Sequence, residues 1–535
     1  MAPIVVNNIE VLQCSTQRPL WPQPKEPSRL LLQAGSKKTP DHRSLPCDII
    51  LERDQPVAVR DGVRIRVDIY RPKTGEKVPA ILMWSPYGKS GTETDHSQSL
   101  DPAEWVPKGY AIVNVDARGI GDSEGDVRGA AEGRDGHDTI EEVANLAWCT
   151  GKVSLAGNSW LALAQWFIAA ERPPHLACIA PLEGGSDHLR EGICRGGIPT
   201  PGFVEMIQRV LSGRQELEDS VAMMEKYPNC RDYWDDKRAR MDKIEVPAYI
   251  LGSFSTMLHT IGSFRGFEEI PHQKKWITVH ATQEWFDLYR KARTENLQKF
   301  FDHYLKGIGN GWEQTPPVRL AVQGFNKPPI LDLPFGQLPW LAPAATDSTQ
   351  TRLYLSHGKT LKPVNDSKYI ALGYGDTEHL TFTYVFDQPI KLLGPTKLVV
   401  SISCPSKPDF DLEHLNIPLE DLGISDQKEA PSINPLKYLG PNGRLRASKR
   451  KVAPEISLHY WQTLAHDEDM PVAAGEVVKM EVWIWPTAIQ FDTGEQLVVK
   501  IAGTCVFTLP EFEFMRQEPM KAAPQIVHVG GKYKS

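Results

Sequence analysis

The chain has 535 residues, with 60 Lys and Arg against 67 Asp and Glu, a formal net charge of −7 and a pI near 6.1. At roughly 100–200 residues per domain, this length predicts two to four globular domains. The hydrophobic share of 41% excludes a disordered or fibrous chain. The acidic balance excludes the broad basic surface that nucleic-acid binding requires.

Targeting signals and cofactor motifs are missing from the sequence. The eight cysteines stand singly, and Met1–Leu20 lacks the charged and then apolar pattern of a signal peptide. No run approaches the ~18 apolar residues of a membrane helix. Zinc, phosphate-loop and dinucleotide motifs are absent as well. The sequence therefore predicts a reduced, cytoplasmic protein with no membrane partner, no metal and no cofactor. Its expected partner is a small molecule, and a homo-oligomer stays open.

Apolar runs that alternate with helical patterns begin at about Asp48 and predict α/β architecture with a parallel sheet. The preceding residues 1–47 lack periodicity and predict an arm that lies over a domain or stays mobile. Arg60-Asp61-Gly62 is a hairpin signal between the first two strands. Strands are expected at residues 57–59, 63–70, 80–84, 111–115, 153–156, 177–180, 249–251 and 276–279, and helices at 136–147, 161–171 and 296–305.

Two changes in pattern divide the chain further. Residues 187–242 are charged, Met-rich and helical with no convincing strand, which predicts an inserted helical cap. The α/β domain would then comprise residues 48–186 and 243–315. From residue 316 to 535 the pattern is all-β and typical of a jelly-roll sandwich. Strands are expected there at 319–322, 351–356, 380–386, 397–403, 477–485 and 497–502.

Two serine turns compete for the role of nucleophile. Gly121-Asp122-Ser123-Glu124-Gly125 is a literal G-x-S-x-G motif, but it lies in a Gly/Asp loop with no apolar helix after it. Gly157-Asn158-Ser159-Trp160 lacks the second glycine, yet it stands between a buried strand and an apolar helix. That context favours Ser159 as the nucleophile, and the alternative is a serine that caps the helix.

Acyl chemistry also requires hydrogen-bond donors aimed at the developing oxyanion. The backbone N–H of Trp160 follows the nucleophile and is one candidate. A second is the hydroxyl of Tyr87 in the turn Ser85-Pro86-Tyr87-Gly88, which ends a strand at the same sheet edge. Taken alone, Tyr87 is better explained as a packing residue than as a catalytic one.

Several motifs together resemble the cocaine esterase / X-prolyl dipeptidyl aminopeptidase (CocE/NonD) hydrolases, from about Asp48 to Gly503. The resemblance implies an α/β-hydrolase domain, a helical cap and a C-terminal jelly roll. It also implies Ser159 as nucleophile and an oxyanion hole made by Tyr87 and the Trp160 amide. The motifs are Arg60-Asp61-Gly62-Val63, Ser85-Pro86-Tyr87-Gly88, Asp116–Gly125, Gly157-Asn158-Ser159-Trp160, Gly196–Phe203 and Arg446-Ala447-Ser448.

The rest of the triad departs from that family. The acid should follow the strand at 249–251, where the family usually has an aspartate and this chain has Ser255. A hydroxyl cannot offset the charge on an imidazolium, and loss of that charge lowers the rate by about 10⁴ in a well-studied triad. We favour His280, which ends the next strand, as the base, with His259 as the alternative. Glu284 or Asp287 could supply the missing charge from a different direction.

The start of the cap contains further candidates. Asp187 and His188 follow the strand at 177–180, where substrate contacts accumulate, although Asp187 is also suited to begin a helix. Tyr233 and Trp234 could line a substrate pocket or pack the cap.

Three functions follow from these residues. The first is a serine acyl hydrolase, or an acyltransferase, that acts on an ester, lactone or amide of a small apolar molecule. The second is a non-hydrolytic cyclase or isomerase of small-molecule biosynthesis that reuses the pocket with Tyr87, His280 or Asp187 as acid or base. The third is a binding protein without catalysis.

Overall fold

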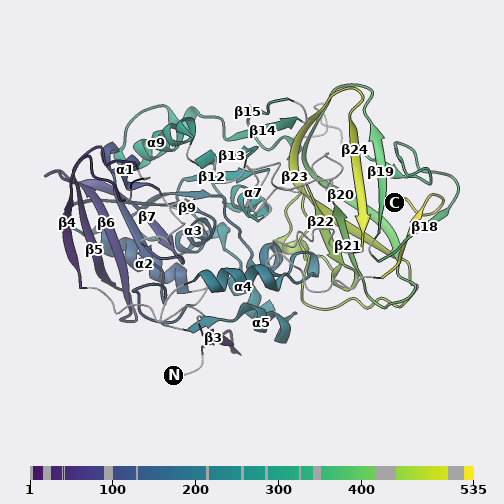
Figure 1. Cartoon of the computed structure of the whole chain (residues 1–535), viewed down its shortest axis with the longest axis horizontal. Helices are drawn as coiled ribbons and strands as arrows, with labels where there is room; N and C mark the ends of the chain where they lie inside the picture. Colours follow the sequence, from purple (N-terminus) through teal and green to yellow (C-terminus); the bar gives the residue numbers. More distant parts are fainter. Residues whose placement is uncertain are drawn as a thin grey trace.

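The computed structural model describes most of the chain, with gaps at several loops. The described residues are 4–15, 26–38, 40, 43–89, 100–127, 131–211, 216–229, 231–254, 258–282, 287–288, 290–324, 327–341, 351–376, 378–415, 441–503 and 523–535. Figure 1 shows an α/β part at one end of the elongated molecule and a β part at the other.

A mixed sheet forms the centre of the α/β domain. Its order is β14-β13-β12-β10-β9-β7-β8-β6-β5-β4, with β7 to β14 parallel and β6, β5 and β4 antiparallel at the edge. Every residue of β7 is buried, as expected for a strand covered on both faces. The strands are β4 (Ser28–Leu32), β5 (Ile49–Ala58), β6 (Arg64–Pro72), β7 (Val78–Ser85), β8 (Ala111–Asp116), β9 (Cys149–Asn158), β10 (Leu176–Leu182), β12 (Ala248–Ser253), β13 (Lys275–His280), β14 (Val318–Gly324) and β15 (Ile330–Phe335).

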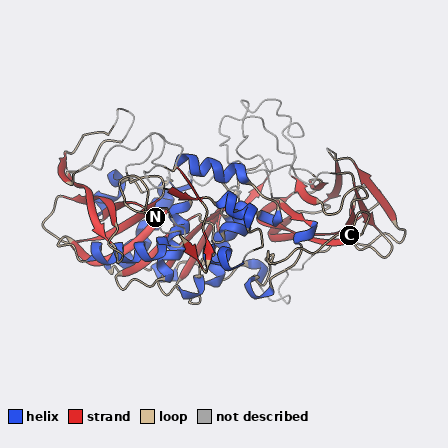
Figure 2. Cartoon of the chain, turned by 90° about the horizontal axis from the view of Figure 1, so that it is seen from below, coloured by secondary structure: helices blue, strands red, loops and turns tan. Residues whose placement is uncertain are grey.

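The helices that follow these strands cover the sheet. α3 is apolar along its length, with Trp166, Ile168 and Ala169 buried between β9, β10 and the neighbouring helix α2. Figure 2 shows the helices gathered in the α/β part, while strands dominate the other end. The helices of this domain are α1 (Pro102–Trp105), α2 (Ala131–Ala144), α3 (Trp160–Ala170), α7 (Thr260–Glu269) and α9 (Lys291–Lys306).

The cap and the N-terminal arm are joined by backbone pairing. The cap contains α4 (Pro201–Val210), β11 (Glu216–Glu218), α5 (Ser220–Lys226) and α6 (Arg231–Trp234), and β11 pairs antiparallel with β3 (Gln13–Ser15) of the arm. The sequence predicted no strand in the cap, because three residues with one apolar side chain give no alternation to recognise. The arm also contains β1 (Val5–Val6) and β2 (Ile9–Glu10), and its β4 extends the central sheet.

The C-terminal domain is a sandwich of two four-stranded sheets, β18-β25-β20-β23 and β19-β24-β21-β22. Alternate residues of both sheets, such as Phe382, Val400 and Met480, are buried between them. Its strands are β16 (Tyr354–Leu355), β17 (Leu361–Lys362), β18 (Ile370–Tyr374), β19 (His379–Val385), β20 (Ile390–Ser403), β21 (Asp411–Leu415), β22 (Gly443–Arg446), β23 (Val478–Phe491), β24 (Gln496–Ala502) and β25 (Gln525–Val529).

The strand at the junction differs from its expected position. The sequence assigned residues 319–322 to the β domain, whereas β14 lies parallel to β13 in the central α/β sheet. The end of β14 then pairs with β23, so one sheet runs through both domains. A short, fully buried apolar run suits either sheet, and only the pairing partner decides between them.

Within the described segments, no helix combines the length and the hydrophobicity that a bilayer crossing requires.

Candidate active site

Ser159 lies at a sharp turn between β9 and α3. Its φ of 60° and ψ of −120° are strained values for a residue with a side chain, as in a nucleophile elbow. Gly157, with φ of 133°, makes the turn possible, since a Cβ there would lie 2.5 Å from the Cβ of Leu161. The Ser159 hydroxyl makes no capping hydrogen bond to α3 within the described part of the chain. The hydroxyl is therefore available to a partner outside α3.

The partner of the Ser159 hydroxyl is His259. The Nε2 atom of His259 lies 3.3 Å from Ser159 Oγ, a distance typical of a nucleophile and its base without substrate. His259 is only 8% exposed and directly precedes α7, whose first residue Thr260 donates a hydrogen bond to the carbonyl of Ser253. The base position is therefore fixed by the end of β12.

His280, which the sequence favoured as the base, pairs with Glu183 in the structure. Its Nε2 is 2.6 Å from Glu183 Oε1, and its Nδ1 is 3.2 Å from Thr282 Oγ1. Burial alone would lower the pKa of His280, but the Glu183 carboxylate outweighs it and raises that pKa above the usual value. The ring nitrogen at Ser159 belongs to His259 because α7 brings it back over the elbow, a tertiary arrangement that strand order alone does not reveal.

Of the two expected oxyanion donors, Trp160 directly follows Ser159, and Tyr87 lies just beyond β7, the strand that pairs with β9. Trp160 is the first residue of α3, and its indole Nε1 donates to both carboxyl oxygens of Glu132, at 3.1 and 3.3 Å. Tyr87 is buried just beyond β7, and its backbone amide donates a hydrogen bond to the Ser85 hydroxyl. Burial raises the pKa of Glu132 to about 8, so this carboxyl is largely protonated at neutral pH.

Asp187 and His188 have separate surroundings. Asp187 begins the helical segment His188–Ile193, accepts the Arg190 amide and pairs with its guanidinium at 2.8 Å. Although burial opposes its charge, that guanidinium keeps the pKa of Asp187 below the usual value. The ring of His188 lies 6.4 Å from that of Trp160, and burial lowers its pKa to about 4. Only His188 therefore adjoins the elbow, as a neutral imidazole.

Tyr233 and Trp234 pack the cap. Both are buried with Leu189, Met223 and residues of the arm, and their rings lie 4.6 Å apart. The Tyr233 hydroxyl donates to Glu218, and the Trp234 indole donates to the carbonyl of Tyr227 at 2.9 Å. These contacts hold the cap together.

Two expected residues lie outside the described part, and two others were missed. Ser255 and Glu284 fall in the gaps at 255–257 and 283–286. Glu183 and Glu132 were not singled out from the sequence. Glu183 directly follows the buried run Leu176–Leu182, and the residue after a parallel strand is a signal that could have identified it. Glu132 lies in a helix start with no such signal.

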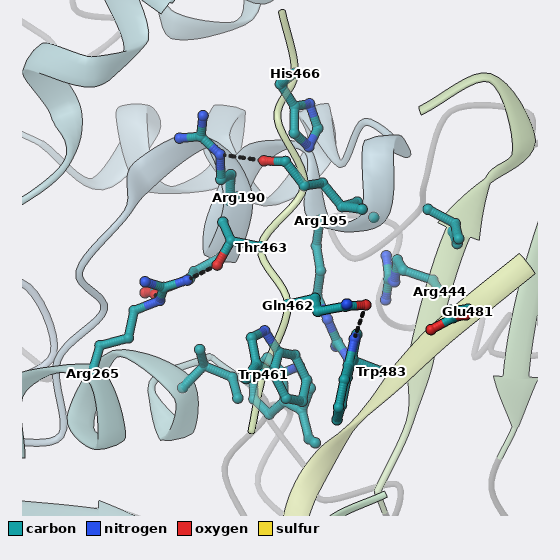
Figure 3. Close-up of a pocket in the computed structure, with 16 residues that line it drawn as sticks. Arg190, Arg195, Arg265, Arg444, Trp461, Gln462, Thr463, His466, Glu481 and Trp483 are labelled. Atoms are coloured by element: carbon teal, nitrogen blue, oxygen red, sulfur yellow. Dashed lines mark hydrogen bonds and ion pairs between the residues drawn. The ribbon is translucent and has the colours of Figure 1, made fainter. Parts of the chain in front are cut away.

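A cavity of about 70 Å³ lies between the cap, α7 and the β domain (Figure 3). Neither Ser159, His259 nor Tyr87 lines it. Arg195 stacks on Trp485 at its wall, and Arg265 of α7 donates to Thr463 and to the carbonyl of Ile456. The β domain thereby anchors the helix that follows His259.

Among the described residues, no three His, Cys, Asp or Glu side chains come together as metal ligands would.

A strained serine on a strand-to-helix turn, with an imidazole against its hydroxyl, defines a serine hydrolase of the α/β-hydrolase fold. Residues 61–220 match the family model of the X-Pro dipeptidyl-peptidase (S15 family). Residues 310–535 match the X-Pro dipeptidyl-peptidase C-terminal non-catalytic domain. The chain belongs to the CocE/NonD, X-Pro dipeptidyl-peptidase-like family of serine hydrolases.

Individual relatives agree with this assignment. The cocaine esterase of Rhodococcus sp. (strain MB1 Bresler) is 38% identical over 135 residues, which span 25% of this chain and 24% of that protein. The crystal structure of a CocE/NonD family hydrolase from Staphylococcus aureus superposes with a TM-score of 0.84 at 26% identity, covering 97% of this chain and 98% of the other. An aminopeptidase from a Thaumarchaeota archaeon shares the fold, with a TM-score of 0.68 at 15% identity over 93% and 98% of the two chains.

Proposed function

We propose that this protein is an esterase that cleaves esters of small apolar acids through an acyl-enzyme on Ser159. The 3.3 Å contact between Ser159 Oγ and His259 Nε2 carries the proposal. His259 would take the hydroxyl proton while Ser159 Oγ attacks the ester carbonyl. The imidazolium would then return the proton to the leaving alcohol as the carbonyl re-forms.

Two donors would stabilise the tetrahedral oxyanion. The Trp160 amide follows the nucleophile at the N-terminus of α3, where backbone N–H groups and the helix dipole favour negative charge. The Tyr87 hydroxyl would supply a second hydrogen bond, in keeping with its position after β7. Water activated by His259 would release the acid and regenerate Ser159.

Esters are the substrates to test first, because an alcohol leaves more readily than an amine, which requires protonation. The relatives agree in part, since one is named cocaine esterase and the family model is named for a dipeptidyl-peptidase.

The decisive experiment is to locate a covalent adduct. A fluorophosphonate probe should modify the purified protein once, and mass spectrometry of its peptides should find the adduct on Ser159. A panel of 4-nitrophenyl esters and an X-Pro-4-nitroanilide should show turnover of the esters first. An adduct on another residue, or turnover of the anilide alone, would overturn the proposal.

His259 should be tested alongside the nucleophile. His259→Gln should lower ester turnover by about 10⁴-fold or more, as the loss of other triad members does. His175→Gln is the control, because His175 is partly exposed and pairs with the Glu141 carboxylate at 2.7 Å rather than with Ser159. Unchanged turnover in His259→Gln would assign the base to another residue.

A further inference from the structure

We infer that Glu183 and His280 form a positioning pair that fixes the main chain of the nucleophile. The inference rests on the proposed role of Ser159. It concerns a carboxylate on the residue that directly follows β10, whose main chain is hydrogen-bonded to Ser159, and an imidazole at the end of β13.

The Glu183 peptide joins the elbow to the sheet. Its carbonyl accepts the amide of Ser159 at 2.9 Å, and its own amide donates to the carbonyl of Leu251 in β12 at 3.1 Å. Glu183 is thus the one-residue bridge between the turn that holds the nucleophile and the strand that leads to His259. A shift of this residue would move both groups relative to each other.

The turn is also packed against the first turn of α3. A Cβ at Gly184 would lie 2.8 Å from the Cβ of Ala162 and 2.9 Å from the amide nitrogen of Leu163. The backbone of residues 183–184 therefore touches the helix start directly, with no space for independent movement.

Glu183 adopts a conformation that its residue type disfavours. Its φ is 67°, in the left-handed region where a side chain costs about 1 kcal/mol or more. A glycine would relieve that strain, so the side chain itself must have a use. The carboxylate reaches His280 at 2.6 Å, and the exposed fractions of the two residues are 0% and 2%.

The environment of His280 suits a charged imidazolium. Its Nε2 faces the Glu183 carboxylate, which accepts an N–H, and its Nδ1 faces the Thr282 hydroxyl, which can accept or donate. Further charges come from Asp287, which favours the protonated ring, and Arg293 of α9, which opposes it. Both ring nitrogens are engaged and the Glu183 carboxylate favours the charged ring, so the pair is suited to hold the Glu183 turn in place.

The test separates positioning from binding. Glu183→Gln keeps the size of the side chain and removes its charge. It should lower kcat for 4-nitrophenyl butyrate by about 10- to 100-fold with KM within about twofold of the parent, as expected for a displaced nucleophile. Glu141→Gln, at the remote His175 pair, is the control and should leave kcat unchanged. A raised KM with kcat intact would overturn the inference.

Two further readouts do not depend on activity. The Ser159 amide should exchange its hydrogen faster in Glu183→Gln, and the His280 ring should titrate at lower pH by NMR. Since the pair acts as a unit, Glu183→Gln/His280→Gln should be no slower than either single variant. Unchanged amide exchange would overturn the inference. Faster exchange in a protein that never forms a Ser159 adduct would support the positioning pair while refuting the proposed esterase.

Discussion

The turns at Ser123 and Ser159 show that a sequence motif alone does not identify a nucleophile. Ser123 satisfies G-x-S-x-G, yet it is buried, and its Oγ accepts the Arg66 amide at 2.8 Å and donates to the Asp116 carbonyl at 2.7 Å. Ser159 lacks the second glycine, yet it has the strained backbone and the imidazole contact. A nucleophile is defined by the strand and the helix that strain its backbone.

The literal motif has a structural role of its own. Asp122 and Asp116 each contact the ammonium of the buried Lys89 at 3.0 Å, and Asp54 contacts it at 2.9 Å. Lys89 lies two residues after Tyr87, so the Ser123 turn supports the loop that would present the oxyanion donor. The Ser159 turn would therefore carry the nucleophile, while the Ser123 turn supports the loop of the oxyanion donor.

Exchanging the nucleophile should have the largest effect. Ser159→Ala should abolish labelling by a fluorophosphonate and lower turnover of 4-nitrophenyl butyrate by about 10⁴-fold or more, because no other group forms the acyl-enzyme. Steady-state kinetics measure the loss, and an unchanged melting temperature confirms that the variant folds. Substantial residual turnover would refute a covalent role for Ser159.

Two glycines, Gly157 before Ser159 and Gly125 after Ser123, should matter unequally. Gly157→Ala adds a Cβ 2.5 Å from that of Leu161 at φ of 133°, and should lower the free energy of unfolding by about 2–4 kcal/mol and slow labelling. Gly125→Ala is the comparison at the other turn. Its Cβ would lie 3.0 Å from Cγ of Arg118, a looser contact than at Gly157, so a smaller loss of about 1–2 kcal/mol is expected. Equal losses in the two variants, measured by denaturation, would contradict the contrast.

Removing the Ser123 hydroxyl should cost stability alone. In Ser123→Ala the Arg66 amide and the Asp116 carbonyl lose their partner, which should lower the free energy of unfolding by about 1–3 kcal/mol. Labelling of Ser159 should proceed at the parent rate. A lost adduct in a variant that remains folded would place Ser123 in the chemistry after all.

The last expected effect is a change of stability with pH, caused by Glu132 at the elbow. Burial raises the pKa of Glu132 to about 8, from an ordinary value near 4.5. Its stabilising contribution is therefore complete below pH 4.5 and falls as pH rises toward 8, because the unfolded chain ionises first. Glu132→Gln cannot ionise, so its melting temperature should rise relative to the parent between pH 5 and 8. A constant difference over that range would show that Glu132 is not protonated.

Much of the fold could be predicted because its signals are local. Runs such as Ala80–Trp84 and Val153–Ala156 are short, apolar and bounded by turns, and they became β7 and β9. The apolar helix after Ser159 became α3. Strands without such signals were missed, including β11, or were assigned to the wrong sheet, as β14 was, because their partners lie far away in the sequence.

The chain by itself determined the architecture and the elbow, since burial, turn residues and helix starts are written within a few residues of one another. Only the tertiary structure decided that His259 contacts the Ser159 hydroxyl. It also decided that Glu183 contacts both the Ser159 amide and the His280 ring. His259, His280 and Glu183 each follow a different strand, and all three strands end at one sheet edge. The spacing of side chains across that edge depends on how α7 and the neighbouring turns pack, which no local pattern records.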